Sequence, residues 1–382
     1  MDKRRREDAF IIRFAATEVV IRQDRVFSCY LDQITRSGTM LALSPGRSLT
    51  DRSSRQYGRQ PWESYSGEVM TSMRLLTFTA RGGRRAGLEI NGKVVDLAGA
   101  AGAKASTDRS VQDLPADLLQ LLESGDAGLR AARSVEAWVR AELTAGRSPI
   151  GPDNQPIVFD PASVRIDPPI ARPGKIICLG RNYAEHAAEG GHEVLPAPIL
   201  FAKFANTIGG PGDAIVAARA TKRLDYEAEL AVVIGKRAKH VAIENALEYV
   251  AGYMNLNDVS ARDLQNETSQ WLRGKGGDTW APCGPYLVTR DEIPDPHALS
   301  IRCLLNGDVM QESNTGMMIF KIPFLIHHIS QTITLEPGDI ISTGTPSGVG
   351  DHRKPPRYLH AGDVVRVEVE GLGALENPVV DE

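Results

Sequence analysis

The sequence predicts a β-rich α+β protein, and three observations indicate that class. Short runs rich in β-branched and apolar residues recur between turn formers, as in "KIICLG", "ELAVVIG", "GPYLVT" and "DVVRVEVEG". Asn91-Gly92 and Asn306-Gly307 each separate two such runs, which is the pattern of a two-residue β-hairpin. Stretches with helical spacing are fewer and do not alternate regularly with the strands, so a parallel βαβ array is not expected.

Residues 1–72 are expected to form a poorly ordered extension. They contain eleven arginines and one lysine, and they run into "SPGRSLTDRSSRQYGRQPWESYSG", which has many turn formers and no periodicity. Nearer the start, "IIRFAATEVVIRQ" is compatible with a strand or a short helix. Five acids among the first 24 residues count against a mitochondrial targeting segment, because such segments are poor in acids. "MRLLTF" at Met73 resembles a natural start.

Two domains are expected after the extension. Residues 73–167 form the smaller α+β domain, because "MRLLTFTA" and "AGLEINGKVVDL" alternate as strands do, while "LPADLLQLLESG" and "GLRAARSVEAWVRAEL" have helical spacing. Prolines between positions 168 and 173 then stiffen the entry to the main domain, residues 168–382. There we expect helices at 182–189, in "AIENALEYVAGY", at the start of "SARDLQ" and in "KIPFLIHHISQ".

The composition of the 382 residues excludes several classes of partner. A net charge of −4 provides no electrostatic footprint for nucleic acid. No apolar run approaches the roughly 20 residues that cross a bilayer, and the N-terminus lacks the pattern of a signal peptide. The four cysteines are far apart without a C-x-x-C pair, which argues against zinc and disulfides and suits a reducing compartment. A cytoplasmic location without nucleic-acid or membrane partners is therefore expected.

Three carboxylates lie where strands are expected to begin or end. Glu227 and Glu229 stand two residues apart in "DYEAELAVVIG", so on a strand their side chains point to the same side. Two negative charges at such a short distance are unfavourable unless a cation lies between them. A hard divalent ion such as Mg²⁺ prefers oxygen ligands. Asp258 ends an apolar stretch just before Ser260, a plausible helix N-cap. The three carboxylates suggest a metal site; an exposed acidic strand is the alternative.

A histidine and a glutamate in "LGRNYAEHAAEGG" are candidates for proton transfer. His186 and Glu189 lie three residues apart, so on a helix they share a face. A carboxylate that orients an imidazole prepares a general base near neutral pH. Gly190 and Gly191 follow directly. The alternative is a solvated helix end with an ion pair of little consequence.

Side chains suited to an anionic substrate follow Asp258. Arg262 and Gln265 share a helical face, and Lys275 lies between two glycines in "WLRGKGGDTWAPCGP". Further on, "ISTGTPSGVGDH" is a Gly-rich loop whose backbone N–H groups and Thr345 are suited to hold a carboxylate or an oxyanion, although a simple turn would look the same. The loop has neither the Gly-Lys-Ser/Thr of a phosphate-binding loop nor the G-x-S-x-G of a nucleophile elbow.

Six blocks of the sequence together resemble the fumarylacetoacetate hydrolase (FAH) family, in the order that the family shows. They are "RPGKIICLGRNYAEHAAEGG", "LDYEAELAVVIGK", "GYMNLNDVSARDLQ", "QWLRGKGGDTWAPCGPYLVT", "NGDVMQESNT" and "TGTPSGVG". The similarity covers about residues 165–382, and the segment from Met73 resembles the small N-terminal domain of many bacterial members. The resemblance implies a mixed β-sandwich roll with that smaller α+β domain, and usually a homodimer.

The resemblance also implies roles for individual residues. Glu227, Glu229 and Asp258 match the ligands of a Mg²⁺ ion, sometimes Mn²⁺ or Ca²⁺. His186 and Glu189 match a catalytic dyad carried on a lid that orders over bound substrate, and Gly190 and Gly191 would be the hinge of that lid. The remaining matched positions are an active-site lysine, Lys275, and the substrate-contacting residues Arg262, Gln265 and Thr345. The chain departs from the family pattern at Ala205-Asn206, where many members have Ser or Thr, and at Gly276, which replaces a frequent Ser; both departures put substrate specificity in doubt more than fold.

The implied reaction is metal-dependent hydrolysis of a C–C bond in an acylpyruvate or another 2,4-diketo acid. His186, oriented by Glu189, would take a proton from the attacking water, and Lys275 or loop N–H groups would stabilise the oxyanion. An oxaloacetate-type decarboxylase, a dienoate isomerase or a ureidoglycolate lyase would use the same metal-stabilised enolate and remains as the alternative. A non-catalytic member that binds oxo acids would need to have lost the base, a ligand or the lysine, and this sequence has lost none of them.

Overall fold

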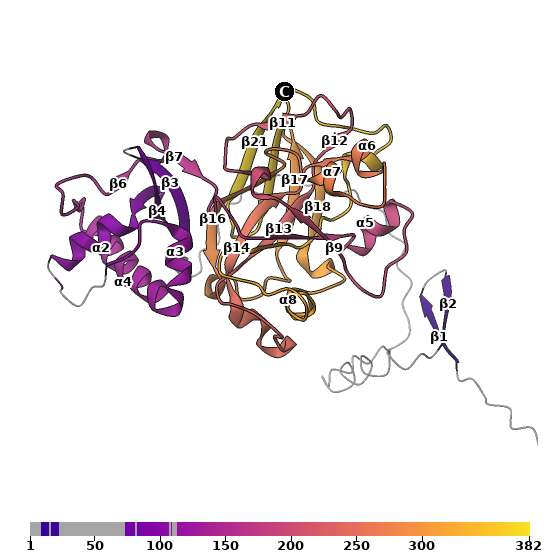
Figure 1. Ribbon diagram of the computed structural model, residues 1–382, viewed down its shortest axis with the longest axis horizontal. Coiled ribbons are helices and arrows are strands. Elements are labelled where there is room, and N and C mark those ends of the chain that lie inside the picture. Colours follow the sequence, from indigo (N-terminus) through magenta and orange to yellow (C-terminus); the bar gives the residue numbers. More distant parts are fainter. Residues whose placement is uncertain (1–8, 15–16, 23–72, 81, 107, 109–112) are drawn as a thin grey trace, which may run out of the picture. The chain divides into compact units, whose positions relative to one another are not determined.

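The computed structural model describes residues 9–14, 17–22, 73–80, 82–106, 108 and 113–382. The chain divides into two compact units, Met1–Gly67 and Glu68–Glu382. In the first unit, strands β1 (Ala9–Phe14) and β2 (Thr17–Arg22) pair as an antiparallel hairpin (Figure 1). "IIRFAATEVVIRQ" therefore contains strands, whereas most of the extension predicted for residues 1–72 lies outside the described residues.

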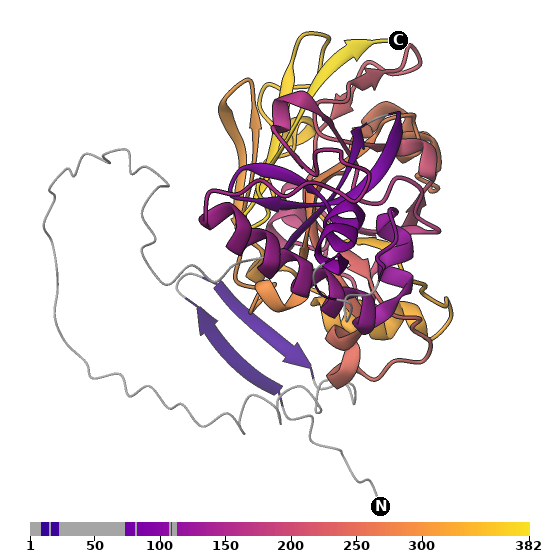
Figure 2. The same cartoon turned by 90° about the vertical axis from the view of Figure 1, so that its left-hand side faces the viewer.

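The second unit begins with a small antiparallel sheet covered by helices (Figure 2). Its strands are β3 (Arg74–Ala80), β4 (Gly83–Ile90), β5 (Lys93–Asp96), β6 (Val158–Phe159) and β7 (Arg165–Asp167). Asn91 and Gly92 have positive φ angles of 52° and 75°, as the predicted two-residue turn between β4 and β5 requires. Helices α2 (Leu97–Ala105), α3 (Leu118–Glu123) and α4 (Gly125–Thr144) pack on these strands.

This sheet continues without a break into the main part of the chain, because β3 pairs with β16 (Ala281–Thr289). Beyond β16 the strands are β14 (Val250–Asn257), β13 (Ala228–Ile234), β19 (Ile340–Ser342), β8 (Ile176–Gly180) and β9 (Ile199–Lys203), with β10 (Ile208–Gly209) beside β16. Every residue of β13 and β14 is buried, so these two strands form the centre of the sheet. Since residues 73–167 share this sheet, the predicted domain boundary at 167/168 stays a prediction.

A five-stranded sheet packs against the centre of the large one and completes a sandwich. Its order is β11 (Ile215–Ala217), β21 (Ala374–Asp381), β20 (Val364–Val369), β17 (Ser300–Leu305) and β18 (Asp308–Asn314). Tyr253 of β14 and Val367 of β20 belong to the shared apolar core. The predicted turn at Asn306-Gly307 joins β17 to β18, again with two positive φ angles. Helix α8 (Ile322–Ser330) occupies the stretch predicted as helical.

The helix predicted between residues 242 and 253 is wrong over much of its length. "AIENALEYVAGY" does not form a single helix: a 3₁₀ helix spans Ile243–Tyr249 and β14 begins at Val250. The stretch from Val250 is buried and hydrogen-bonded to β13 on one side and β16 on the other. Pairing with two partners therefore overrides the helical spacing of the apolar residues.

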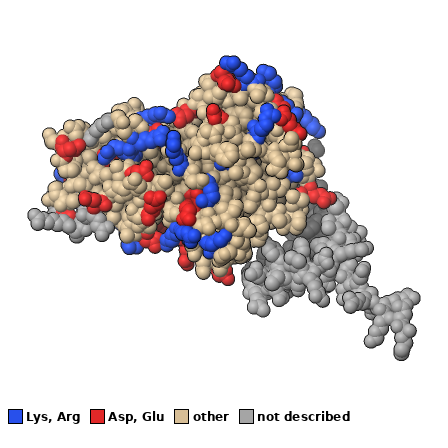
Figure 3. Space-filling view, in the orientation of Figure 1, with Lys and Arg blue, Asp and Glu red and all other residues tan. Residues whose placement is uncertain are grey.

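Charged side chains of both signs are interspersed over the face shown in Figure 3. Within the described parts of the chain, no helix has the length and apolar character that crossing a membrane requires.

Candidate active site

Three carboxylates converge at one end of β13 and β14. Glu227 directly precedes β13, Glu229 is its second residue, and Asp258 follows the last residue of β14. The antiparallel register places Ala228 opposite Asn257, which brings these strand ends together. Ligand oxygens of the three buried carboxylates lie within 4.8 Å of one another. The structure thus brings together the three residues that the E-x-E spacing and the strand end suggested.

Ser260 does not cap a helix, contrary to the prediction. It belongs to the short strand β15 (Ser260–Ala261), which pairs with β12 (Leu224–Asp225), and its hydroxyl donates to the carbonyl of Asp258 at 2.8 Å. Helix α6 (Arg262–Gln265) begins directly after β15, without a side-chain cap. Strand pairing fixes the backbone before and after Asp258, so the position of its carboxylate is fixed as well.

Buried cations compensate part of the negative charge. Lys275, at the end of α7 (Leu272–Lys275), donates to Glu227 at 2.7 Å and to Asp258 at 2.8 Å. Arg262 Nη1 lies 2.7 Å from the other oxygen of Glu227. Burial alone would raise the pKa of Glu227, but Lys275 and Arg262 hold it well below its ordinary value. Burial would lower the pKa of Lys275, but Asp258 and Glu227 raise it, so both partners stay charged at neutral pH.

Lys203, at the end of β9, is another buried cation of the cluster. Its ammonium donates to the backbone carbonyls of Val259, Lys275 and Trp280 at 3.1, 2.5 and 2.8 Å. It also lies 2.7 Å from Asp258 Oδ1, as an ion pair without hydrogen-bond geometry. Lys203 therefore ties β9, α7 and the end of β14 together beneath the carboxylates.

Glu229 has a carboxylate oxygen that is left over. Its Oε2 accepts hydrogen bonds from the Ser342 hydroxyl at 2.5 Å and from the Gly344 N–H at 2.8 Å. Its Oε1 is buried and has no hydrogen-bond partner among the described residues. Burial, and then the charges of Asp258 and Glu227, raise the pKa of Glu229 well above its ordinary value. A buried free oxygen beside two other carboxylates fits a hard divalent cation, so Glu227, Glu229 and Asp258 could hold Mg²⁺, Mn²⁺ or Ca²⁺.

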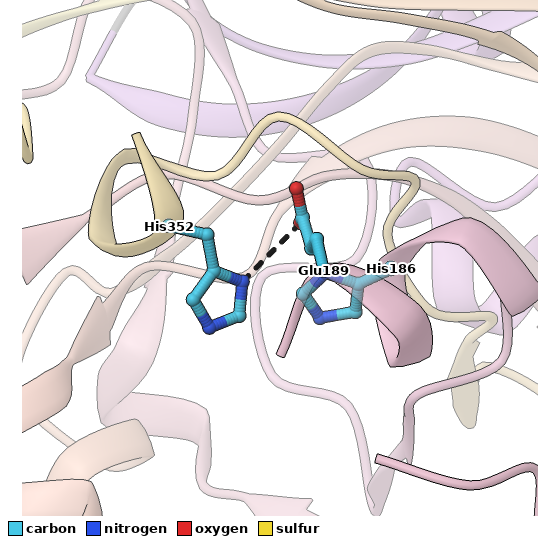
Figure 4. Close-up of side chains that lie close together, drawn as sticks. All are labelled: His186, Glu189 and His352. Carbon is cyan, nitrogen blue, oxygen red and sulfur yellow. Dashed lines mark hydrogen bonds and ion pairs between the residues drawn. The ribbon is translucent and has the colours of Figure 1, made fainter. Parts of the chain in front are cut away.

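The predicted histidine–glutamate pair is formed on α5 (Ala184–Glu189). His186 Nδ1 lies 2.8 Å from Glu189 Oε1 (Figure 4). His352, which belongs to the Gly-rich loop, has its Nδ1 3.4 Å from the same oxygen. Glu189 Oε2 accepts from the N–H of Gly348 at 3.0 Å. Burial would raise the pKa of Glu189, but the bonds from His186 and Gly348 lower it, so the carboxylate is ionised. The movement of α5 as a lid about Gly190-Gly191 stays a prediction.

The predicted substrate-contacting residues are packed around the carboxylates. Arg262 donates from Nε to Asp225 at 2.9 Å and from Nη1 to Gln265 at 3.1 Å, while its buried Nη2 has no hydrogen-bond partner among the described residues. The hydroxyl of Thr345 donates to the carbonyl of Ala228 at 2.9 Å and accepts from Gln311, so it is already engaged. Arg262 Nη2 is therefore a buried donor that is available to an additional anion.

A cavity of about 360 Å³ connects these groups. Its lining includes six of the nine residues predicted from the sequence: His186, Glu227, Arg262, Gln265, Lys275 and Thr345. Glu189 and Asp258 contact lining residues directly, and Glu229 lies in the same carboxylate cluster. The cavity brings the candidate base, the candidate metal ligands and two buried cations to one small volume.

Several residues of the site were not predicted. Arg181, His192, Trp271 and His352 also line the cavity. Asp225 could have been found, because it continues the alternation of Glu227 and Glu229 by one step. Lys203 and His352 carry no local signal, since their partners lie far away in the sequence. The two departures from the family pattern meet each other: Asn206 donates to the carbonyl of Gly276 at 3.1 Å.

Comparison with known proteins identifies the family. Residues 175–380 match the family described as "Fumarylacetoacetate (FAA) hydrolase C-terminal". "Oxaloacetate tautomerase fahd2, mitochondrial" of Xenopus laevis is 42% identical over 326 residues, which cover 84% of this chain and 94% of that protein.

Solved structures agree with this match. "Fumarylacetoacetate hydrolase (EaFAH) from psychrophilic Exiguobacterium antarcticum" aligns with a TM-score of 0.63 and 35% identity over 81% of this chain and 100% of that chain. The 2-hydroxyhepta-2,4-diene-1,7-dioate isomerase from Mycobacterium marinum aligns with a TM-score of 0.59 and 30% identity over 81% of this chain and 99% of that chain. The β-rich α+β fold predicted from the sequence is thereby confirmed, and the chain belongs to the fumarylacetoacetate hydrolase family.

Proposed function

We propose that the protein is a divalent-metal-dependent enzyme that interconverts the enol and keto forms of a small 2-oxo dicarboxylic acid, with oxaloacetate as the first candidate. The observation that carries this proposal is that His186 and the Glu227 carboxylate line the same cavity. The Xenopus relative, named an oxaloacetate tautomerase and similar over most of both chains, supports the choice of substrate.

Tautomerisation moves one proton between the oxygen on C2 and the carbon beside it. A cation on Glu227, Glu229 and Asp258 would bind the oxygens of the 2-oxo acid and stabilise the negative charge that develops on the C2 oxygen. His186 has its Nδ1 engaged by Glu189, which leaves Nε2 to exchange the proton at carbon. Arg262 supplies its free Nη2 to the substrate's charge.

Hydrolysis of a C–C bond in an acylpyruvate is the second candidate. The same dyad would serve it by taking a proton from water, and the solved structure from Exiguobacterium antarcticum is named a fumarylacetoacetate hydrolase. The cavity of about 360 Å³ leaves room for a water and an acyl group beside a four-carbon acid. Both reactions need the same dyad and the same carboxylates, so the products distinguish them.

The test follows the loss of enol absorbance of oxaloacetate with Mg²⁺, with EDTA, and with Glu229→Gln in Mg²⁺. Metal-dependent loss without release of CO₂, weakened in Glu229→Gln, is the expected result. Release of CO₂ would indicate a decarboxylase instead. Cleavage of an acylpyruvate panel to pyruvate and an acid, without an effect on the oxaloacetate enol, would favour the hydrolase. Rates that are unchanged by EDTA would refute the metal-dependent reaction.

The assembly and the location of the protein are also proposals. The homodimer expected from the resemblance would be measured by the mass of the purified protein in solution. The cytoplasmic location predicted from the sequence differs from that of the Xenopus relative, whose name includes "mitochondrial". Fractionation of cells that express the full chain would settle the location of this protein.

A further inference from the structure

Arg181 is a charged side chain on the cavity whose charge is not matched by an acid. The other cations near the carboxylates are engaged: Lys275 donates to two carboxylates and Arg262 to one, with a second within ion-pair distance. Asp351, an acid of the cavity lining, is paired with Arg223. Arg181 has no ion pair and no hydrogen bond from its guanidinium to any of the described residues. An arginine that lines a cavity in this state is poised to meet an anion from solution.

Aromatic rings hold this arginine in place. The guanidinium of Arg181 lies 5.8 Å from the ring centre of Trp271, and the ring of Trp271 packs edge-on against Phe201 at 5.4 Å. On the other side, the ammonium of Lys275 lies 5.0 Å from the ring centre of Phe201. The two rings therefore connect Arg181 to the lysine that bonds the carboxylate cluster. Arg181 and the cluster are parts of one packed arrangement on the same cavity.

The backbone at Arg181 has an unusual conformation, and the preceding glycine allows the ring of Trp271 to pack closely. Arg181 has φ +56°, in the left-handed region that residues other than glycine rarely adopt. A Cβ on the preceding residue, Gly180, would lie 2.5 Å from the ring of Trp271, so glycine is required for the ring to pack there. Unusual backbone conformations of this kind persist where the surrounding structure demands them, and they concentrate at binding sites.

Three histidines share the cavity with Arg181, namely His186, His192 and His352. The pKa of His192 is lowered by partial burial and then by the charges of Arg181, His352 and His186. Arg181 is therefore the permanent positive charge beside these imidazoles, and an anion that enters this part of the cavity meets its guanidinium.

We propose that Arg181 binds the second carboxylate of the substrate and thereby selects dicarboxylic over monocarboxylic 2-oxo acids. The proposal rests on the proposed function, in which the carboxylate and carbonyl of C1 and C2 lie at the metal ligands. The opposite end of a four-carbon dicarboxylate then faces the cation that still lacks a partner. A substrate with an uncharged end leaves Arg181 unpaired and gains nothing from it.

The test compares binding of malate and lactate, two 2-hydroxy acids that share the first carboxylate but differ in the second. Calorimetric titrations use the full chain with Mg²⁺, as wild type, as Arg181→Met, and as Arg237→Met, a control at an exposed arginine paired with Glu336. We expect the wild type and the control to prefer malate. In Arg181→Met that preference should fall about 10- to 100-fold, as the loss of a charged hydrogen bond predicts, with lactate binding unchanged.

Equal affinity of the wild type for malate and lactate, or a preference that survives in Arg181→Met, would overturn the proposal. A parallel fall in affinity for both acids would assign Arg181 to general support of the site and would also overturn it. The readout is binding, so it does not depend on turnover. Loss of the preference in Arg181→Met together with a wild type that leaves the oxaloacetate enol untouched would retain the carboxylate subsite and refute only the proposed reaction.

Discussion

Lys203 shows how a residue that never meets the substrate can control the site. Its ammonium is fully buried, bonded to three backbone carbonyls and 2.7 Å from Asp258. In Lys203→Met these acceptors lose their partner while Asp258 keeps its buried charge. We expect the free energy of unfolding to fall by about 3–5 kcal/mol, as for other broken buried ion pairs. Urea denaturation of the two proteins measures this difference.

Lys236→Met is the matched control for that prediction. Lys236 donates to Asp126 at 2.9 Å, but both side chains are exposed, so water replaces the lost bond. The expected loss is about 1 kcal/mol or less. Similar losses in the two variants would contradict the structural role assigned to Lys203.

The site residues that could be predicted from the sequence are those whose partners lie only a few positions away in the chain. Glu227 and Glu229 were found because a strand places alternate residues on one side, and His186 and Glu189 because a helix does so every third or fourth residue. Lys203 and His352 could not be found in this way. Their partners, Asp258 and Glu189, lie 55 and 163 residues away in the sequence, and only the folded sheet brings them together.

The Gly-rich loop is an element whose glycine matters for contact as well as for conformation. Gly348 has φ +99°, and a Cβ there would lie 2.4 Å from the carbonyl oxygen of Met310. Its N–H also donates to Glu189. In Gly348→Ala we expect the free energy of unfolding to fall by about 1–3 kcal/mol, together with a lower kcat, because the loop must shift to relieve the contact and its bond to Glu189 is disturbed.

Gly307→Ala separates the two effects. Gly307 has φ +90° in the β17–β18 turn, but open space surrounds the position of a Cβ. This variant should lose stability through backbone strain alone and keep the kcat of the wild type. If Gly348→Ala kept its kcat as well, the loop would have no part in positioning Glu189.

Helix α5 is held on this loop by an ionised carboxylate, which makes its docking sensitive to acid. The pKa of Glu189 is lowered in the folded protein, so its bonds contribute fully above the unfolded-state pKa of about 4.3 and are lost as pH falls through the lower folded-state pKa. We expect the difference in stability between the wild type and Glu189→Gln to shrink as pH falls below about 4. Unfolding curves from about pH 5 downward measure this difference, and a difference that grows as pH falls below about 4 would contradict the assignment.

Elements were predictable where one local pattern dominated. The two Asn-Gly turns and α8 follow from turn chemistry and apolar spacing. The helix prediction for the stretch from Ile243 was wrong because β14 pairs with a strand on each side. The segment itself gives no sign of these two partner strands. Helix α2 was not predicted, since its alanines and glycines give little apolar contrast between faces.

At the scale of the molecule, pairing of β3 with β16 makes residues 73–167 part of the large sheet. Leu75 lies opposite Leu287, and Arg133 of α4 donates to Thr289 at 3.0 Å. We expect residues 73–382 to unfold in one calorimetric transition. A chain reduced to residues 168–382 should aggregate, because β16 would lose a partner strand. Two separate transitions, or a stable and monodisperse 168–382 fragment, would show that the two parts fold independently.

In the proposed function, the His186–Glu189 pair moves the proton of a 2-oxo acid held at the buried carboxylates. The most direct measurement is kcat for ketonisation of the oxaloacetate enol in saturating Mg²⁺, for the wild type and for His186→Ala with an unchanged thermal midpoint. We expect kcat to fall by about 10²- to 10⁴-fold in His186→Ala, which is the usual contribution of a positioned acid–base group. Equal rates in the two proteins would show that His186 does not transfer the proton.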